Sequence, residues 1–267
     1  MDNRSIGVID SGLGGLTVMK QIMDEFPYEN IVYFGDTGRV PYGSRSKETI
    51  IKYSMSDVKF LESHDVKMII IACGTASSVA LSYVRQNSNI PIVGVVDATS
   101  NAAVKATRNK KVGIIGTNGT IKSGAYEKII NQYGIETYSK SCPLFVPLVE
   151  NGHFDTEVSK LVVEEYLCEI KKEEVDTLIL GCTHYPHLKK VITEYMGDNV
   201  TLIDPGIELA RCLKDELDKD MLHSKKTDEE QYKYFVSDSV EGFEELASTF
   251  LNKNINGKVK KIDIEKY

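Results

Sequence analysis

Two cysteines stand in closely matched surroundings, each after an apolar run and with a threonine within the next two residues. Cys73 follows Ile69–Ala72, and Cys182 follows Leu178–Gly181. An ordinary thiol has a pKa of about 8.5, which a helix N-terminus or a nearby cation lowers. One thiolate can then take a proton from a carbon atom while a thiol on the opposite face returns one. The pair predicts inversion at a stereocentre; the alternative is that buried cysteines only fill apolar space.

Each cysteine is predicted to have a polar assistant. His184 lies two residues after Cys182 and is placed to tune that thiol or to carry its proton. The alternative is a histidine that caps a helix or bonds within the core. Asp10 ends the first apolar run and is expected to hold the corresponding place near Cys73. These residue types also bind Zn²⁺, but no C-x₂-C or H-x₃-H spacing involves them, so we expect no metal.

A glycine-rich loop, Ser11–Gly15, follows Asp10. Its glycines permit a tight turn and the close approach of a ligand. Ser11 and the backbone amides are candidates to bind a carboxylate at the N-terminus of the following helix. The spacing is not G-x-G-x-x-G, and the acid precedes the glycines, so the loop does not indicate a dinucleotide site. The alternative is a plain turn between a strand and a helix.

Further polar groups come after predicted strands, where a ligand would meet them. Tyr42 and Gly43 lie in a polar loop that is either a substrate contact or an ordinary turn. Thr117 and Thr120 lie in a second loop, where they would bond a substrate or cap the next helix. Glu150 follows another predicted strand and would meet a substrate ammonium group or end that strand in solvent.

Short apolar runs rich in valine and isoleucine alternate with longer amphipathic stretches, which is typical of parallel βαβ units. The predicted strands are Ile6–Ile9, Ile31–Phe34, Met68–Ala72, Ile92–Val96, Val112–Ile115, Leu144–Leu148 (continuing to Val149), Thr177–Leu180 and Leu202–Ile203. The predicted helices are Leu16–Phe26, Lys47–Ser63, Thr75–Gln86, Ile121–Tyr133, Thr156–Lys172 and Pro186–Tyr195. The fold class is therefore α/β.

The chain repeats one strand–loop pattern. Ile6–Gly12 resembles Val112–Gly119, and Ile69–Thr75 resembles Leu178–Thr183. In open parallel sheets the carboxyl ends of the strands border the ligand crevice. Two copies that face each other would each direct one cysteine into a shared cleft. We predict two pseudosymmetric parallel-sheet α/β domains with the active site in the cleft between them.

The C-terminal part is expected to pack back on the first copy. Its pattern predicts the helices Ile207–Leu222 and Val240–Leu251 and a strand-like segment, Val259–Ile264. The first domain would then be discontinuous, comprising residues 1–96 plus 207–267, and would carry Cys73. The second domain would comprise residues 97–206 and carry Cys182.

Composition narrows the function classes. The chain has 267 residues, a formal net charge of -7 and a pI of about 5.4. Where its lysines are adjacent they form short pairs mixed with acidic residues, and the sequence does not indicate nucleic-acid binding. No apolar run is long enough for a signal sequence or a membrane span, so we expect no membrane association. The odd number of scattered cysteines favours a reducing cytoplasm, and we interpret Cys142, Cys168 and Cys212 as apolar fillers.

These features together resemble the glutamate racemases of the aspartate/glutamate racemase superfamily. The resemblance spans most of the chain and is weakest after about Gly206. The stretches that carry it are Gly7–Val18, Tyr33–Thr37, Pro41–Gly43, Ala72–Cys73 with Thr75–Ser77, Gly116–Thr117 with Gly119–Ile121, Cys142–Glu150 and Gly181–Pro186.

The resemblance implies interconversion of L-glutamate and D-glutamate without pyridoxal phosphate or any other cofactor. It implies a source of D-glutamate for peptidoglycan in a bacterial cytoplasm, and a homodimer. Cys73 would act on the D-enantiomer with the help of Asp10, and Cys182 on the L-enantiomer with the help of His184. The substrate-binding positions that it implies are Ser11, Tyr42, Gly43, Thr75, Thr117, Thr120 and Thr183.

One departure lies beside the first cysteine. The family usually has asparagine where this chain has Gly74, and Asp97-Ala98 replaces a more usual Glu-Pro. An asparagine amide can hydrogen-bond a substrate, whereas glycine offers only backbone and space. We predict a reshaped substrate contact at Gly74. An aspartate or broader acidic amino-acid racemase stays open, as does a catalytically silent amino-acid-binding protein of the same fold.

Overall fold

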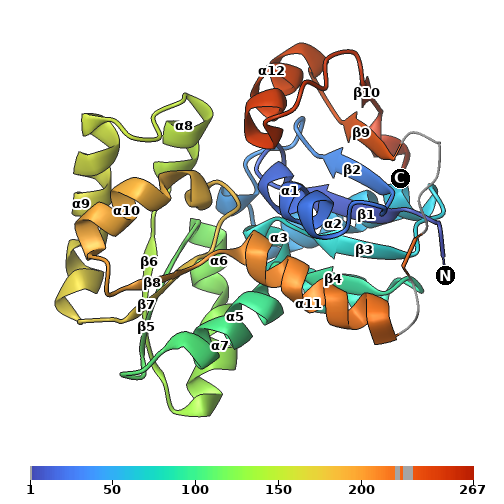
Figure 1. Ribbon diagram of the computed structural model, residues 1–267. Coiled ribbons are helices and arrows are strands. Elements are labelled where there is room, and N and C mark those ends of the chain that lie inside the picture. The colour runs from blue at the N-terminus through green and yellow to red at the C-terminus, as the bar shows by residue number, and fades with distance from the viewer. Residues whose placement is uncertain (1, 220–222, 225–230) are drawn as a thin grey trace.

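The structure is a computed structural model that describes residues 2–219, 223–224 and 231–267, and its strands form two separate sheets (Figure 1). Every strand pair is parallel. We call the parts built on the two sheets the first lobe and the second lobe. The predicted fold class, two parallel-sheet α/β units, is confirmed.

The first sheet has six strands within the described residues. They are β1 (Ile6–Asp10), β2 (Ile31–Gly35), β3 (Met68–Ile71), β4 (Ile92–Gly94), β9 (Tyr232–Val236) and β10 (Val259–Lys261). Their order across the sheet is β10-β9-β2-β1-β3-β4. In β1, Ile6 and Val8 join one hydrophobic cluster and Ile9 joins another. The strand is buried on both faces, which explains its uninterrupted apolar sequence.

The second sheet has four strands within the described part of the chain. They are β5 (Lys111–Gly116), β6 (Glu136–Ser141), β7 (Thr177–Leu180) and β8 (Thr201–Ile203). Their order, β6-β5-β7-β8, matches the order β2-β1-β3-β4 in the first sheet. The repeat predicted from the sequence is therefore a repeat of topology.

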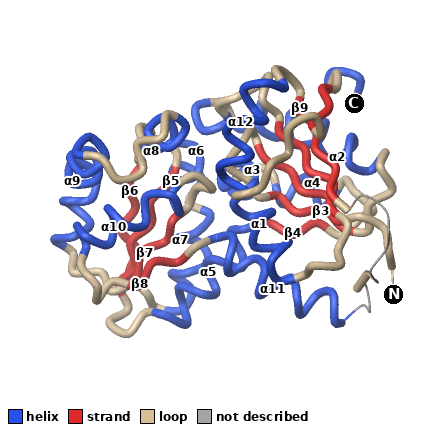
Figure 2. The backbone as a smooth tube through the Cα atoms, turned by 45° about the horizontal axis from the view of Figure 1, so that its top comes forward, coloured by secondary structure: helices blue, strands red, loops and turns tan. Residues whose placement is uncertain are grey.

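Helices cover the faces of both sheets (Figure 2). They are α1 (Leu16–Glu25), α2 (Lys47–Glu62), α3 (Gly74–Val79), α4 (Leu81–Gln86), α5 (Val95–Ala106), α6 (Asn118–Ser123), α7 (Ala125–Ile130), α8 (Phe145–Glu150), α9 (Glu157–Lys172), α10 (Lys189–Met196), α11 (Pro205–Lys219) and α12 (Val240–Leu251). Four 3₁₀ turns in the described residues are η1 (Tyr42–Ser44), η2 (Asn131–Tyr133), η3 (Tyr185–Leu188) and η4 (Ile264–Lys266).

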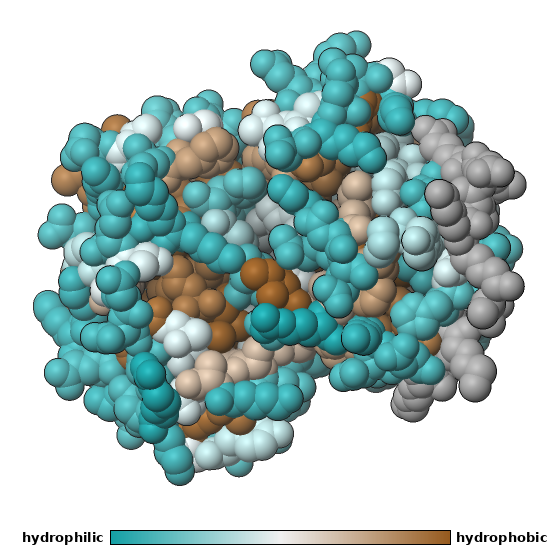
Figure 3. All heavy atoms as spheres, viewed as in Figure 1, coloured by the Kyte–Doolittle hydropathy of each residue, from teal (hydrophilic) through white to brown (hydrophobic). Residues whose placement is uncertain are grey.

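Two neighbouring helices connect the lobes. The helix α5 leads from β4 in the first sheet to β5 in the second, and α11 leads back from β8. They pack against each other, and α11 also packs against α1. Figure 3 shows the molecule from the same side as Figure 1. The rim of the face in view is mainly hydrophilic, and hydrophobic residues gather towards its middle. Within the described residues no helix is long and apolar enough to cross a membrane.

The C-terminal part adds to the first sheet, where β9 pairs with β2 and β10 pairs with β9. The predicted helix Ile207–Leu222 corresponds to α11, and its last three positions lie outside the described residues. The division into residues 1–96 plus 207–267 and 97–206 stays a prediction. Its limits fall at α5 and α11, which connect the two lobes.

One predicted strand is wrong, because Leu144–Leu148 forms most of the helix α8. Phe145, Leu148 and Val149 are buried at helical spacing, and Pro147 lies in the first turn, where a missing amide costs little. The strand β6 escaped prediction because it is an edge strand with polar, partly exposed residues. The strand β9 also escaped, and the predicted helices Thr75–Gln86 and Ile121–Tyr133 are each divided into shorter pieces.

A buried ion pair lies at the amino ends of the central strands of the first sheet, away from their carboxyl ends. The ammonium of Lys67 lies 2.5 Å from Oε2 of Glu29, and both side chains are almost fully buried. Lys67 also donates to the backbone carbonyl of Asp2 at 2.9 Å and to the hydroxyl of Ser224 at 3.1 Å. The pair thus joins the start of the chain, the start of β3 and the C-terminal part.

We expect Lys67→Met to lower the free energy of unfolding by about 3 kcal/mol, because it leaves the buried carboxylate of Glu29 without its cation. The measurement is urea denaturation followed by circular dichroism. The double variant Lys67→Met/Glu29→Gln removes both charges and should recover most of the loss. A wild-type unfolding midpoint for Lys67→Met alone would contradict this assignment.

Candidate functional site

A cavity of about 370 Å³ lies where the carboxyl ends of the two sheets meet. This is an ordinary size for a small-molecule site. Both Cys73 and Cys182 line it, one from each lobe. The other lining residues are Ser11, Gly12, Leu13, Val40, Pro41, Tyr42, Gly43, Ser44, Gly74, Thr75, Thr117, Asn118, Pro143, Val146, Pro147, Glu150, Thr183 and His184.

Cys73 follows β3 and is the N-cap residue of α3. Its sulfur accepts a hydrogen bond from the amide of Ala76 at 3.5 Å, and its thiol donates to the hydroxyl of Ser11 at 3.5 Å. Burial, together with the nearby charge of Asp10, raises the pKa of Cys73 to about 12. Cys73 is therefore a neutral thiol at pH 7.

Asp10 ends β1, the strand next to β3, and is almost completely buried. Its Oδ2 accepts a hydrogen bond from the amide of Gly12 at 2.9 Å. Burial raises the pKa of Asp10, and the charge of His184 partly opposes that shift. Asp10 lies near Cys73 and does not itself line the cavity, so the structure places it behind the thiol.

Cys182 begins a chain of three polar side chains. Its sulfur lies 3.8 Å from Nδ1 of His184, and Nε2 of His184 lies 3.0 Å from Oε1 of Glu150. Burial alone would lower the pKa of His184, but its bonds to Cys182 and Glu150 outweigh burial and raise the pKa to about 10. The imidazolium stabilises negative charge on the adjacent sulfur. The two thiols therefore face the cavity in opposite electrostatic surroundings.

Glu150 lies at the end of the helix α8 rather than after a strand. Because α8 turns its carboxylate toward His184, the side chain holds the imidazole and is not simply free in solvent. Its side chain is 42% exposed, whereas that of His184 is 8% exposed. The sequence offered Glu150 as a partner for an ammonium group or as the end of a strand in solvent, and nothing local pointed to His184 across 34 residues.

The loop with Tyr42 and Gly43 is held from behind by a buried polar network. The hydroxyl of Tyr42 donates to Asp36 and, at 3.0 Å, to Asp57. Arg39 donates to both carboxylates, at 2.6 Å and 2.7 Å. Burial and the charge of Asp36 raise the pKa of Asp57. The hydroxyl of Tyr42 thus points into this network and away from the cavity. Tyr42 and Gly43 therefore line the cavity with atoms other than this hydroxyl.

The four predicted threonines divide into two groups. Thr75, Thr117 and Thr183 line the cavity, but Thr120 does not. The hydroxyls of Thr75 and Thr117 lie 2.8 Å apart and join the two lobes. Thr120 is fully buried behind them, with its hydroxyl 3.1 Å from that of Thr117. Thr117 also caps α6, as one of the two alternatives predicted, and its bond to a substrate stays a prediction.

Several apolar lining residues were missed in the sequence. Val146 and Pro147 line the cavity from α8, and the incorrect strand assignment concealed them. Helical spacing in that segment was the signal that could have revealed them. Leu13 and Val40 line the opposite side, within loops from which only polar residues and glycines had been selected.

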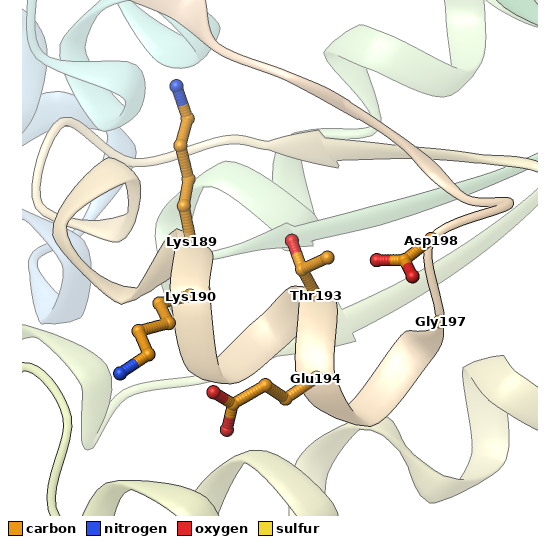
Figure 4. Close-up of a pocket in the computed structure, with 6 residues that line it drawn as sticks. All are labelled: Lys189, Lys190, Thr193, Glu194, Gly197 and Asp198. Carbon is orange, nitrogen blue, oxygen red and sulfur yellow. The ribbon is translucent and has the colours of Figure 1, made fainter.

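A second cavity lies beside α10, where Figure 4 shows Lys189 and Lys190 extending away from each other. Lys189 pairs with Asp204 at 2.5 Å, and Lys190 pairs with Asp155. No cysteine lines that cavity in the described structure, so the thiol chemistry belongs to the first one. Within the described ranges, no group of three or more His, Cys, Asp or Glu residues could hold a metal ion.

Comparison with known proteins identifies the family. A model of the Asp/Glu/hydantoin racemase family matches residues 6–213. The chain belongs to this family. The resemblance drawn from the sequence motifs is thereby confirmed, and so is the prediction of an amino-acid racemase.

The relatives of this racemase match it over nearly their whole length. A glutamate racemase from Geobacter metallireducens is 44% identical over 98% of this chain and 97% of its own. One from Persephonella marina is 45% identical over 98% of both chains. The structure of a glutamate racemase from Francisella tularensis in complex with D-glutamate superposes with a TM-score of 0.93, at 37% identity and with both chains fully covered.

We expect Glu150→Gln to lower the pKa of His184, because the imidazolium loses its anionic partner. In the wild-type racemase this histidine should titrate near pH 10. Because the pKa of His184 is raised in the folded protein, protonation of His184 stabilises the fold. This contribution to the free energy of unfolding is complete below pH 6.5 and is lost as the pH rises through about 10. The stability difference between wild type and variant should therefore shrink at high pH.

The measurement is an NMR titration of the His184 ring protons, with His184→Gln used to assign the signal. Urea denaturation of the same proteins across the pH range measures the stability difference. If the midpoint of the NMR pH titration of His184 is unchanged in Glu150→Gln, Glu150 does not control the protonation of His184.

Proposed function

We propose that this racemase interconverts L-glutamate and D-glutamate by transferring protons at the α-carbon between two thiols. The observation that carries the proposal is the placement of Cys73 and Cys182, which line one cavity from opposite lobes. A two-sided arrangement is what inversion requires, because the proton leaves one face of the carbon and returns to the other.

The surroundings of the two thiols support a direction for each. For L-glutamate, the thiolate of Cys182 takes the α-proton, and the electron pair stays on the carbon. Cys73, held as a thiol by burial beside Asp10, then donates its proton to the opposite face. The reverse sequence converts D-glutamate. His184 and Asp10 assist by stabilising the protonation states from which each half of the reaction begins.

The cavity is suited to an acidic amino acid although no lysine or arginine is among its described lining residues. Hydroxyl groups of Ser11, Thr75, Thr117 and Thr183 are donors for the two carboxylates, together with backbone amides at Tyr42 and Gly43. A neutral set of donors holds the charged substrate without ion pairs. The carboxylate of Glu150, which lines the cavity and is partly exposed beside His184, is then available to the substrate ammonium.

Wider roles follow from the family resemblance. Relatives named glutamate racemase, at 41% to 45% identity, support glutamate as the substrate. The product D-glutamate would supply peptidoglycan synthesis in a bacterial cytoplasm. We also propose a homodimer and a reaction without cofactor, with the thiols themselves as the acid and base.

The second candidate is an aspartate or broader acidic amino-acid racemase, because Gly74, which lines the cavity beside Cys73, departs from the family's usual asparagine. Side-by-side rates with glutamate and aspartate decide between the two. A silent amino-acid-binding protein would bind glutamate without exchanging its enantiomers, and a metalloprotein would retain metal through purification.

We expect purified protein without added cofactor to racemise L-glutamate in D₂O and to place deuterium on the α-carbon of the product. Optical rotation and NMR together follow inversion and exchange. Inversion without deuterium would contradict proton transfer between the thiols, because the thiol that returns a proton to the carbon has exchanged that proton with D₂O. Folded protein that neither inverts nor exchanges glutamate would overturn the proposed function.

Cys73→Ala and Cys182→Ala should each lower the racemisation rate by at least about 10²-fold, because each removes one acid or base of the pair. Cys168→Ala is the matched control, since Cys168 lies on α9 and does not line the cavity. The measurement is kcat with each enantiomer. Normal racemisation by either of the first two variants would refute the two-thiol mechanism.

A further inference from the structure

The backbones beside the two thiols approach each other across the lobes so closely that no Cβ atom fits between them at position 74. Gly74 directly follows Cys73, and Gly181 directly precedes Cys182. A Cβ atom placed on Gly74 would lie only 2.3 Å from the carbonyl oxygen of Gly181 and 3.6 Å from the Cα of Cys182. Any residue with a side chain at position 74 therefore requires a different distance between the two cysteine loops.

We propose that Gly74 sets the separation of the two thiols, as a positioning residue for the two-thiol reaction. The inference rests on the proposed function, which it deepens by assigning a purpose to the glycine that replaces the family's usual asparagine. Because Gly74 has no side chain, the backbones of the two cysteine loops lie closer together than a larger residue at this position would allow.

Backbone hydrogen bonds hold both loops against a local shift. The amide of Gly181 donates to the carbonyl of Ile115 in β5 at 2.7 Å, which ties that loop to the second sheet. A Cβ on Gly181 would in turn lie 2.6 Å from the same carbonyl. On the other side, the amide of Ser77 donates to the carbonyl of Cys73 at 2.8 Å in the first turn of α3. A side chain at position 74 is therefore expected to increase the distance between the two lobes.

Cross-lobe hydrogen bonds surround this contact and depend on the same spacing. The hydroxyl of Thr17 donates to the carbonyl of Thr183 at 2.9 Å, and the hydroxyls of Thr75 and Thr117 lie 2.8 Å apart. To relieve a 2.3 Å contact, the loops must separate by about 1 Å, the difference from an ordinary carbon–oxygen contact. A shift of about 1 Å between reacting groups can lower a rate by about 100-fold.

The test compares Gly74→Ala and Gly74→Asn with the control Gly242→Ala. Gly242 lies on the exposed side of α12, and a Cβ there would have no neighbour within 4 Å. We expect both Gly74 variants to lower kcat by about 100-fold with L-glutamate and with D-glutamate, while KM changes much less. The control should keep wild-type kcat and KM.

Crystal structures of wild type and Gly74→Ala provide a readout that does not depend on activity. We expect the distance from the Cα of residue 74 to the carbonyl oxygen of Gly181 to increase by about 1 Å in the variant. This result is expected even if glutamate proves not to be the substrate, so failure of the proposed function and failure of this inference are distinguishable.

Several results would overturn the inference. Gly74→Ala or Gly74→Asn with unchanged kcat would do so, and so would a raised KM at constant kcat, which would assign Gly74 to direct substrate contact. If the variants do not fold, the wild-type structure with D-glutamate bound decides. Contact between Gly74 and Gly181 in that complex supports the inference, and a gap wide enough for a side chain refutes it.

Discussion

The α-proton of an amino acid is very weakly acidic, and this constraint governs the arrangement of the whole molecule. A thiolate can remove such a proton only from a fixed, close position, and inversion requires a second thiol on the opposite face. One parallel sheet presents its strand carboxyl ends to one side only. Two sheets with the same strand order, facing each other, supply both positions, and the repeat in the chain provides those sheets.

The two thiols need different surroundings although the lobes repeat. Cys73 has the buried carboxylate of Asp10 behind it, and its pKa is raised to about 12 by burial and that charge. Cys182 has the imidazolium of His184 beside it, which Glu150 helps to keep protonated. The proposed reaction depends on this asymmetry, since it uses one sulfur as the base and the other as the acid. It arises from side chains at the strand ends and beyond them, because the two sheets share the same strand order.

The sequence predicted the elements that depend on local pattern. The buried strands β1, β3, β5 and β7 are continuous apolar runs, so the loops that carry Asp10, Cys73 and Cys182 could be located from the sequence alone. The segment Phe145–Glu150 was misread because a short apolar run fits a strand or a helix equally well. The edge strand β6 lacked an apolar signal altogether.

Contacts between distant segments lie beyond such patterns. Tyr42 was expected at the substrate, yet its hydroxyl bonds Asp36 and Asp57, which the sequence separates from it by 6 and 15 positions. The contact of Gly74 with the carbonyl of Gly181 depends on how the lobes meet, which neither strand pattern encodes. In both cases the sequence suggested a direct contact with the substrate, whereas in the structure the residue helps to position the backbone that lines the cavity. A sequence motif does not distinguish a residue that contacts the substrate from one that positions the cavity backbone, and only the spatial arrangement separates these two roles.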